Sequence, residues 1–213
     1  MSAIFALRDA VVTADRYPLL AGVTAEFSGP NCLVVTGPNG AGKTSLLRLL
    51  AGLVPLTAGD ARVLDFDLAT VDRRVIRRHV GWLGHDGSFY DDLTVRENLR
   101  FAAKASGVTA ACDDALERVG LASRGDLRAR SLSAGQRRRM GLAWLILRRP
   151  ALWLLDEPYA SLDVNGRDLL DGLVADAVRD GASVVLTSHD DLRVAPADAR
   201  ALRLVGGRVV SCS

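Results

Sequence analysis

An eight-residue stretch near the start of the chain restricts the possible folds more than any other feature. It reads Gly37-Pro38-Asn39-Gly40-Ala41-Gly42-Lys43-Thr44, which matches the Gly-x-x-x-x-Gly-Lys-Ser/Thr pattern of a phosphate-binding loop. Residues 32–36, just before it, are apolar and rich in β-branched side chains, which predicts a buried strand. Leucines recur at helical spacing over residues 43–53, which predicts a helix after the loop. The motif therefore lies between a strand and a helix, where a phosphate loop must lie.

The residue types in this loop suit the chemistry of a nucleotide's phosphates. Glycines allow the backbone N–H groups to turn inward around the anion without a clash from Cβ atoms, and the helix that follows points the positive end of its dipole at the same place. Lys43 supplies a charge for the outer phosphates, and the hydroxyl of Thr44 is a ligand for Mg²⁺. The alternative is a chance glycine loop before a helix. The strand and helix around it favour nucleotide binding.

A second segment joins five apolar residues to two acids, Ala151-Leu152-Trp153-Leu154-Leu155-Asp156-Glu157. Isolated carboxylates at the end of a buried strand are costly, and a nearby Mg²⁺ would offset that cost for Asp156. Glu157 could polarise an attacking water. Both acids could instead face solvent at the strand end. The phosphate loop makes catalysis the favoured interpretation.

Apolar strands alternate with helical segments, which indicates an α/β fold with a largely parallel sheet. Strands are expected over residues 4–12, 23–27, 151–155 and 182–187, and helices over 113–119 and 166–179. Thr94 and Glu97 form a capping box that opens a further helix. Gly206-Gly207 lies between two short strands and predicts a hairpin.

Composition excludes several classes of protein. The 213 residues suit a globular fold, and a net charge of +2, from 27 basic and 25 acidic residues, gives no reason to expect a polyanion along the surface. The apolar run 143–147 is far shorter than the roughly 20 residues that cross a bilayer. Neither a secretory signal nor a Cys-x-x-Cys pattern is present, and the three scattered cysteines indicate reduced thiols.

A third segment, Leu132-Ser133-Ala134-Gly135-Gln136, precedes a helical stretch and places its Ser133 hydroxyl 23 residues before Asp156. Taken alone, such a segment is an ordinary helix cap more often than a ligand site. Its place in a series is informative: phosphate loop, Leu-Ser-Ala-Gly-Gln, Leu-Leu-Asp-Glu-Pro, Ser-Leu-Asp and Thr-Ser-His. This series, spread over residues 4–210, resembles that of the nucleotide-binding subunits of ABC transporters. We call residues 132–136 the signature.

The resemblance implies a P-loop ABC-ATPase fold in a single nucleotide-binding domain, residues 1–213. Its core would be a mainly parallel sheet, with an N-terminal antiparallel β part and a helical subdomain over roughly residues 86–150. It also implies ATP and Mg²⁺ as cofactors. Two such domains, identical chains in the simplest case, would pair head to tail, with each ATP held between the phosphate loop of one and the signature of the other.

The resemblance also assigns roles to residues. ATP would contact the loop residues of its own chain, Gly37, Pro38, Asn39, Gly40, Ala41, Gly42, Lys43, Thr44 and Ser45. The partner's nucleotide would contact the signature residues Ser133, Gly135 and Gln136. Asp156 becomes a magnesium ligand and Glu157 the general base. His189 would hold the γ-phosphate and the attacking water in line, and Asp163 would lie at the dimer seam.

Three positions depart from the family pattern. Ala134 replaces the more common glycine of the signature and adds one methyl group. His85 stands where a glutamine usually serves as magnesium ligand and sensor, and an imidazole is a different ligand from an amide. Tyr17 is the candidate for stacking on adenine, although it comes a few residues late and could be a plain rim residue.

The compact length, the Leu-Gly-His segment and Trp-Leu-Leu-Asp-Glu-Pro are similar to the ATPase subunits of haem exporters in cytochrome c maturation. That similarity implies a peripheral protein at the cytoplasmic face of the membrane, bound to integral membrane subunits. Phe89, Tyr90 and Leu93 would line the groove for those subunits or pack within the helical subdomain. Haem itself is not expected to bind here, since there is no Cys-x-x-Cys-His.

Two alternatives remain open. An exporter of another cargo (a lipid, drug or peptide) would show the same motifs, because cargo choice belongs to the membrane subunits. A soluble ABC-type ATPase acting on DNA, ribosomes or iron–sulfur assembly is the other. Only 90 residues separate Lys43 from Ser133, which leaves no room for the coiled coil of DNA-repair members. The arginines at 73–78 and 137–139 suit solvated helix faces, so no nucleic-acid partner is expected.

Overall fold

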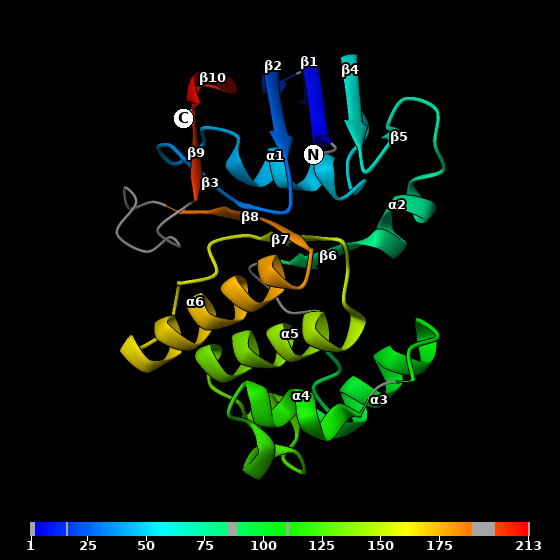
Figure 1. Ribbon diagram of the computed structural model, residues 1–213, viewed down its shortest axis with the longest axis vertical. Coiled ribbons are helices and arrows are strands. Elements are labelled where there is room, and N and C mark those ends of the chain that lie inside the picture. Colours follow the sequence, from blue (N-terminus) through cyan, green and yellow to red (C-terminus); the bar gives the residue numbers. More distant parts are fainter. Residues whose placement is uncertain (1–2, 16, 85–88, 110, 189–198, 213) are drawn as a thin grey trace.

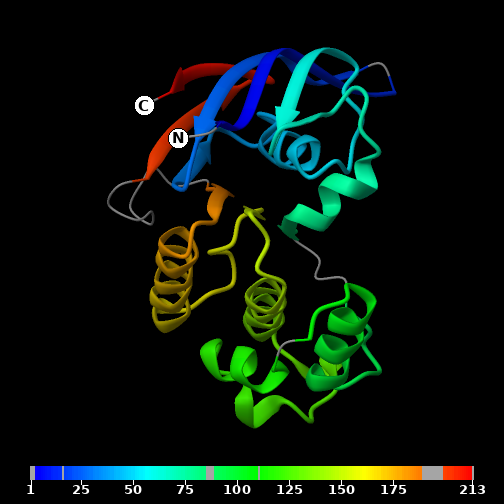
Figure 2. The ribbon, with the colours of Figure 1, turned by 45° about the vertical axis from the view of Figure 1, so that its right-hand side comes forward.

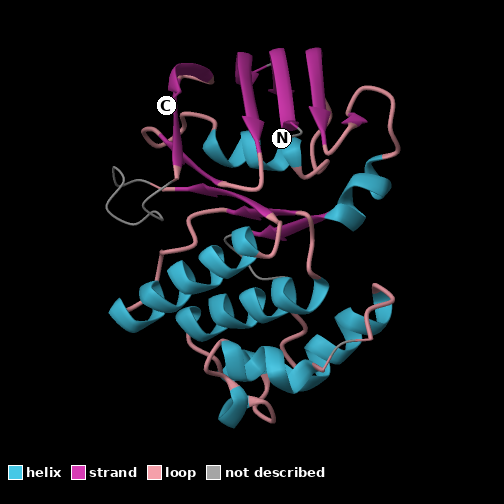
Figure 3. Cartoon of the chain, viewed as in Figure 1, coloured by secondary structure: helices cyan, strands magenta, loops and turns pink. Residues whose placement is uncertain are grey.

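The computed structural model describes residues 3–15, 17–84, 89–109, 111–188 and 199–212. Two sheets and a group of helices make up this part of the chain (Figure 1). The larger sheet crosses the middle of the molecule, with antiparallel strands above it in that view and most of the helices below it (Figure 3). This arrangement confirms the predicted α/β class, with a mainly parallel core and an N-terminal antiparallel part.

Six strands form the central sheet in the order β10-β9-β3-β8-β7-β6. All neighbouring pairs are parallel except the last hairpin. Its strands are β3 (Cys32–Thr36), β6 (Val80–Leu83), β7 (Leu152–Leu155), β8 (Ser183–Thr187), β9 (Arg200–Val205) and β10 (Arg208–Cys212). Every residue of β3, β7 and β8 is buried, which explains their unbroken apolar sequences. Their carboxyl ends meet at one edge of the sheet.

A second, antiparallel sheet has the order β2-β1-β4-β5, with β1 (Ala3–Ala14), β2 (Tyr17–Ser28), β4 (Ala58–Val63) and β5 (Phe66–Asp67). Helix α1 (Lys43–Leu50) lies beneath these strands (Figure 2) and contacts both β1 and β8. Its four leucines, Leu46, Leu47, Leu49 and Leu50, are fully buried. The helix ends at Leu50, before the predicted residue 53, because Gly52 takes a left-handed φ of 65°.

Helices α5 (Ala134–Arg148) and α6 (Val164–Arg179) cover the other face of the central sheet, and α3 (Val95–Ala105) and α4 (Cys112–Arg118) pack beyond α5 (Figure 1). The sheet thereby separates two apolar cores. Alternation along β3 shows this: Val34 faces the helices, whereas Leu33 and Val35 face α1 and the antiparallel sheet. Within the described ranges, no helix combines the length and apolar character that crossing a bilayer requires.

Local sequence signals located several elements well. The hairpin at Gly206-Gly207 is confirmed, since both glycines have positive φ, 55° and 75°. The capping box is also confirmed: the Glu97 amide donates to Thr94 Oγ1 at 3.1 Å, and the Thr94 amide donates to Glu97 Oε2 at 2.8 Å. Strand β6 and helix α2 (Arg73–His79) were not predicted from the sequence, β6 because it has only four residues.

Candidate active site

The phosphate loop, residues 37–44, has the close backbone packing that its glycines permit. Gly37 has a φ of 144°, and a Cβ there would lie 2.1 Å from the carbonyl oxygen of Leu204. Gly42 precedes α1 with a φ of 100°, and its Cβ would lie 2.7 Å from the carbonyl oxygen of Leu19. The loop therefore packs against the backbone of strands β9 and β2. Its crest, residues 38–40, is exposed.

Lys43 curls back across this loop. Its Nζ donates to the carbonyl oxygens of Gly37 at 2.7 Å and Pro38 at 3.2 Å, and the side chain is buried. The charge of Lys43 is therefore held within the phosphate loop. Its contact with phosphate oxygens stays a prediction.

Two segments 112 residues apart meet beside the loop. The hydroxyl of Thr44 lies 3.1 Å from Asp156 Oδ1 and 3.0 Å from Asp156 Oδ2. Thr44 follows β3 and Asp156 follows β7, so the contact arises because both strands end at the same edge of the sheet. Asp156 is only 5% exposed. It does not face open solvent, which removes the solvent-facing interpretation for this acid.

Thr187, at the end of β8, is the partner that sequence reasoning missed. Its hydroxyl donates to Asp156 Oδ1 at 2.8 Å and accepts from the Glu157 amide at 2.7 Å. One fully buried hydroxyl thus orients the carboxylate and the next backbone amide together. The sequence signal for Thr187 was a polar residue that directly follows the apolar residues 184–186.

Glu157 has an unusual backbone for a non-glycine residue. Its φ is 48°, in the left-handed region, which costs free energy and is found at functional sites where neighbouring contacts hold it. Its carbonyl oxygen accepts from the Ala160 amide at 3.1 Å and from Arg138 Nη2 at 3.0 Å. The residue after the metal-ligand candidate is therefore held by specific contacts.

The expectation of a solvated face for residues 137–139 is wrong for Arg138. Three consecutive helical positions span more than half a turn, so they cannot all face solvent on a packed helix. Arg138 is 8% exposed and donates to the carbonyl oxygens of Gly84 at 2.8 Å and Asp156 at 3.3 Å. Burial lowers the pKa of Arg138, while the charges of Asp156 and Glu157 act in the opposite direction.

The signature forms the start of α5. Ser133 is the N-cap: its Oγ accepts from the Gln136 amide at 3.2 Å, and the Ser133 amide donates to Gln136 Oε1 at 3.0 Å. Gly135 packs so closely that a Cβ would lie 2.8 Å from the Ser161 carbonyl oxygen. A hollow of about 330 Å³ opens here, lined by Ser133, Gly135, Gln136, Arg139, Ser161, Leu162 and Asp163.

The Ser-Leu-Asp segment contacts the signature helix directly. Asp163 caps α6 by accepting from the Gly166 amide at 2.8 Å, and its Oδ1 also lies 3.3 Å from Arg139 Nη2. The described residues lining the signature hollow include none from the phosphate loop. Within one chain, then, Thr44 contacts Asp156 beside the phosphate loop, whereas Ser133 lines a separate hollow.

Three predicted site residues receive less support. Tyr17 is the first residue of β2 and is 78% exposed, so its ring is open to a ligand or to solvent alike. His85 and His189 lie outside the described residues. Their roles as metal ligand and switch remain predictions.

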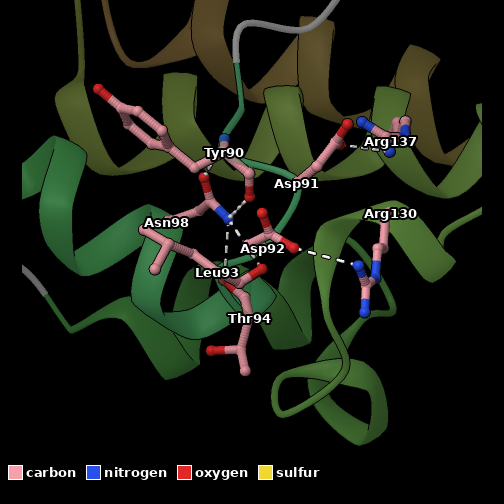
Figure 4. A network of polar contacts seen from close by, with 8 residues as sticks. All are labelled: Tyr90, Asp91, Asp92, Leu93, Thr94, Asn98, Arg130 and Arg137. Atoms are coloured by element: carbon pink, nitrogen blue, oxygen red, sulfur yellow. Dashed lines mark hydrogen bonds and ion pairs between the residues drawn. The ribbon is translucent and has the colours of Figure 1, made fainter.

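The loop expected to meet membrane subunits is held by Asn98 (Figure 4). The side chain of Asn98 accepts from the Tyr90 amide at 2.8 Å and donates to the carbonyl oxygens of Tyr90, Leu93 and Thr94 at 3.0–3.3 Å. Phe89 packs against the helical core, whereas Tyr90 is 56% exposed and stacks edge-on against Phe101. Phe89 thus packs within the helical subdomain, and Tyr90 is left open to a partner.

Two ion pairs fasten the same loop to the signature region. Arg137 Nη2 lies 2.6 Å from Asp91 Oδ1, and Arg130 Nη1 lies 3.2 Å from Asp92 Oδ1 (Figure 4). Arg137 is in the first turn of α5, so the loop and the signature are neighbours.

Comparison with known proteins gives consistent matches. Residues 20–160 match the family described as ABC transporter. The chain is 39% identical over 204 residues to the cytochrome c biogenesis ATP-binding export protein CcmA of Escherichia coli O157:H7, covering 96% of this chain and 98% of that protein. The protein of the same name from Escherichia coli K12 is 39% identical over 201 residues, covering 94% and 96%.

Solved structures share the fold. A bacterial ABC transporter cassette in a dimeric structure gives a TM-score of 0.90 at 22% identity, covering 98% of this chain and 97% of that one. A bacterial Atm1-family ABC exporter with ATP bound gives a TM-score of 0.87 at 23% identity, covering 98% of this chain and 38% of that one.

Proposed function

The chain belongs to the ABC transporter family, and from that premise we propose that it binds and hydrolyses ATP as the energy-supplying subunit of an export system for cytochrome c biogenesis. One observation carries the proposal: Thr44 and Asp156 meet within 3.1 Å beside the phosphate loop, in a chain 39% identical over nearly its whole length to export ATPases of that process.

The site has the donors that Mg²⁺ prefers. Thr44 supplies a hydroxyl oxygen and Asp156 a buried carboxylate, and Mg²⁺ is usually held by one or two such protein oxygens together with substrate phosphates. His85 is a further proposed ligand. When bound, the ion would neutralise charge on the phosphates.

Each part of the site would have its own role in the reaction. Lys43 binds the phosphates together with the other loop residues, Gly37, Pro38, Asn39, Gly40, Ala41, Gly42, Thr44 and Ser45. Glu157 accepts the proton of the attacking water as general base, and His189 orients that water. Tyr17 stacks on adenine. Positioning and charge stabilisation account for most of the catalysis in phosphoryl transfer.

We further propose that two identical chains complete each site. The signature hollow is open and is lined by none of the described phosphate-loop residues, which suits a role for Ser133, Gly135 and Gln136 toward a partner's γ-phosphate. The start of α5 adds backbone amides and a helix dipole that favour an anion. Asp163 lies beside this hollow, at the proposed seam.

The relatives are named as ATP-binding export proteins of cytochrome c biogenesis, which supports a proposal for the membrane partners and the cargo. We propose that the protein is peripheral at the cytoplasmic face of the membrane, docked on integral subunits through the loop around Tyr90 and Leu93. Haem is the proposed cargo, carried by those subunits rather than by this chain. Purified with them, the chain should show ATP hydrolysis that responds to haem; purified alone, it should carry no haem absorbance.

A complementation experiment tests the shared site. Lys43→Met disables the loop and Ser133→Arg blocks the signature, so each variant should be inactive as a homodimer. Mixed dimers keep one intact site, and an equimolar mixture should recover up to about a quarter of wild-type hydrolysis if pairing is symmetric. An equimolar mixture of the double variant with wild type is the control: its mixed dimers keep no intact site, so only wild-type homodimers, about a quarter of the dimers, should stay active, whereas independent chains would keep about half of the activity. Failure of the single variants to complement would contradict the shared site.

A further inference from the structure

Two arginines fasten the signature helix α5 to backbone carbonyl groups, one at each end. Near the start of the helix, Arg138 donates to the carbonyl oxygens of Gly84, Asp156 and Glu157 at 2.8, 3.3 and 3.0 Å. Near its end, Arg148 donates to the carbonyl oxygens of Val80 at 2.6 Å and Arg77. Ten residues of helix, about 15 Å, separate the two anchors.

Only the first anchor reaches the reactive end of the sheet. The three carbonyls that Arg138 contacts belong to the segment after β6 and to the two acids after β7. Burying a guanidinium is expensive unless its donors are satisfied, and Arg138 is 8% exposed. The planar guanidinium of an arginine presents five donors in a rigid fork, whereas the ammonium of a lysine is a compact charge on a flexible stem.

The Glu157 carbonyl is the informative contact. Glu157 has a left-handed backbone, φ 48°, and such a conformation persists only where the surroundings determine it. Three bonds do so here: the Glu157 amide to Thr187 Oγ1, and its carbonyl oxygen to the Ala160 amide and to Arg138. Of these, only the bond to Arg138 comes from the signature helix.

We propose that Arg138 is a positioning residue that joins the signature helix to the strand end carrying Asp156 and Glu157, and so fixes the backbone from which Glu157 acts. This inference rests on the proposed function. In a head-to-tail dimer, Ser133 contacts the partner's nucleotide, while Arg138, five residues along the same helix, holds the chain's own acids. Contact of the signature with the partner's nucleotide would thereby change the position of Glu157 in the same chain.

The kinetic test compares Arg138→Met with Arg148→Met, which removes a matched anchor from the same helix. Arg138→Met should lower kcat by about tenfold or more while the Kd for ATP stays within about threefold, because a positioning loss acts on the transition state. Arg148→Met should change kcat by less than about twofold. A kcat for Arg138→Met equal to that of Arg148→Met would overturn the proposal. If Arg138→Met fails to fold, Arg138→Lys should give an intermediate kcat.

A second measurement does not depend on hydrolysis. Hydrogen exchange of the Ala160 amide in nucleotide-free protein should become at least about tenfold faster in Arg138→Met or Arg138→Lys and stay unchanged in Arg148→Met, because local opening exposes that bond. Unchanged exchange in both Arg138 variants would refute the positioning role. Faster exchange in these variants, in a protein whose wild type hydrolyses no ATP, would instead retain the positioning role and reject the proposed function.

Discussion

Thr187 and Asp156 form a buried hydroxyl–carboxylate pair, with Thr187 Oγ1 2.8 Å from Asp156 Oδ1. The same hydroxyl accepts a hydrogen bond from the backbone amide of Glu157 at 2.7 Å. A single side chain on β8 therefore links the metal-ligand candidate and the base candidate, both of which follow β7. The pairing depends on β7 and β8 being parallel neighbours that end together.

Thr187→Val should impair both hydrolysis and stability. Valine has nearly the same shape but leaves the buried Glu157 amide without its acceptor, which costs about 1–3 kcal/mol. We expect kcat to fall roughly tenfold or more, since a small misplacement of reacting groups has large effects. Steady-state ATPase assays and thermal unfolding measure the two effects.

Ser183→Ala is the matched control for Thr187→Val. Ser183 lies at the other end of β8, is fully buried, and its hydroxyl has no hydrogen-bond partner among the described residues. Its removal should leave kcat unchanged and stability equal or slightly higher. If Thr187→Val hydrolysed ATP as fast as Ser183→Ala, the orienting role of Thr187 would be incorrect.

Gly37→Ala should abolish nucleotide binding, and Gly40→Ala should weaken it less. Both glycines have positive φ, so both variants carry backbone strain. They differ in space: a Cβ at Gly37 would lie 2.1 Å from the Leu204 carbonyl oxygen, whereas nothing lies within 4 Å of a Cβ at Gly40. Calorimetric titration with ATP would compare them. Equal affinities would show that packing against β9 does not shape the loop.

The sequence located those parts of the site that depend on local pattern. Gly37 to Thr44 could be recognised because strand, loop and helix are contiguous, and Ser133 because a helix cap is a local feature. Thr187 and Arg138 could not be identified, because their roles depend on which strands become neighbours and which face of α5 is buried. Strand β6 was missed because four residues carry too little periodicity to separate it from α2.

Asn98→Ala should destabilise the loop before α3. Asn98 is 3% exposed and makes four hydrogen bonds to the backbone of residues 90–94 (Figure 4). Losing them leaves several buried groups unpaired, which we expect to cost about 2–4 kcal/mol. Arg130→Gln, which breaks the exposed pair with Asp92, should cost less than about 1 kcal/mol. Urea unfolding measures the loss of unfolding free energy in both variants. Equal losses would contradict a stabilising role for the buried Asn98 side chain.

Acid should weaken the cap of α3 through Glu97. Hydrogen bonds from the Thr94 backbone amide and side chain lower the pKa of Glu97 in the folded chain. Its ionised form therefore favours folding. That contribution is complete above the ordinary glutamate pKa of about 4.3 and disappears as pH falls through the lowered value.

Comparing wild type with Glu97→Gln by urea unfolding tests this pH dependence. The wild-type advantage should be constant from neutral pH down to about pH 5 and shrink toward pH 3, following the linkage relation. Glu117→Gln, on the exposed surface of α4, controls for the loss of one surface charge. An advantage that grew on acidification would contradict the stabilising role of the ionised Glu97 carboxylate.

Glu157→Gln should separate ATP binding from ATP hydrolysis. The glutamine side chain has the same size and leaves the backbone hydrogen bonds of residue 157 in place. Its carboxamide, however, cannot accept a proton from water. Loss of a group acting in the transition state typically lowers the rate by about 10²–10³, so bound ATP should persist and hold two chains together. Size-exclusion chromatography with ATP should show a stable dimer that wild type forms only transiently. A wild-type rate of ATP hydrolysis in this variant would show that Glu157 is not the general base. The contacts of Arg138 and Thr187 would then serve to hold the backbone beside Asp156.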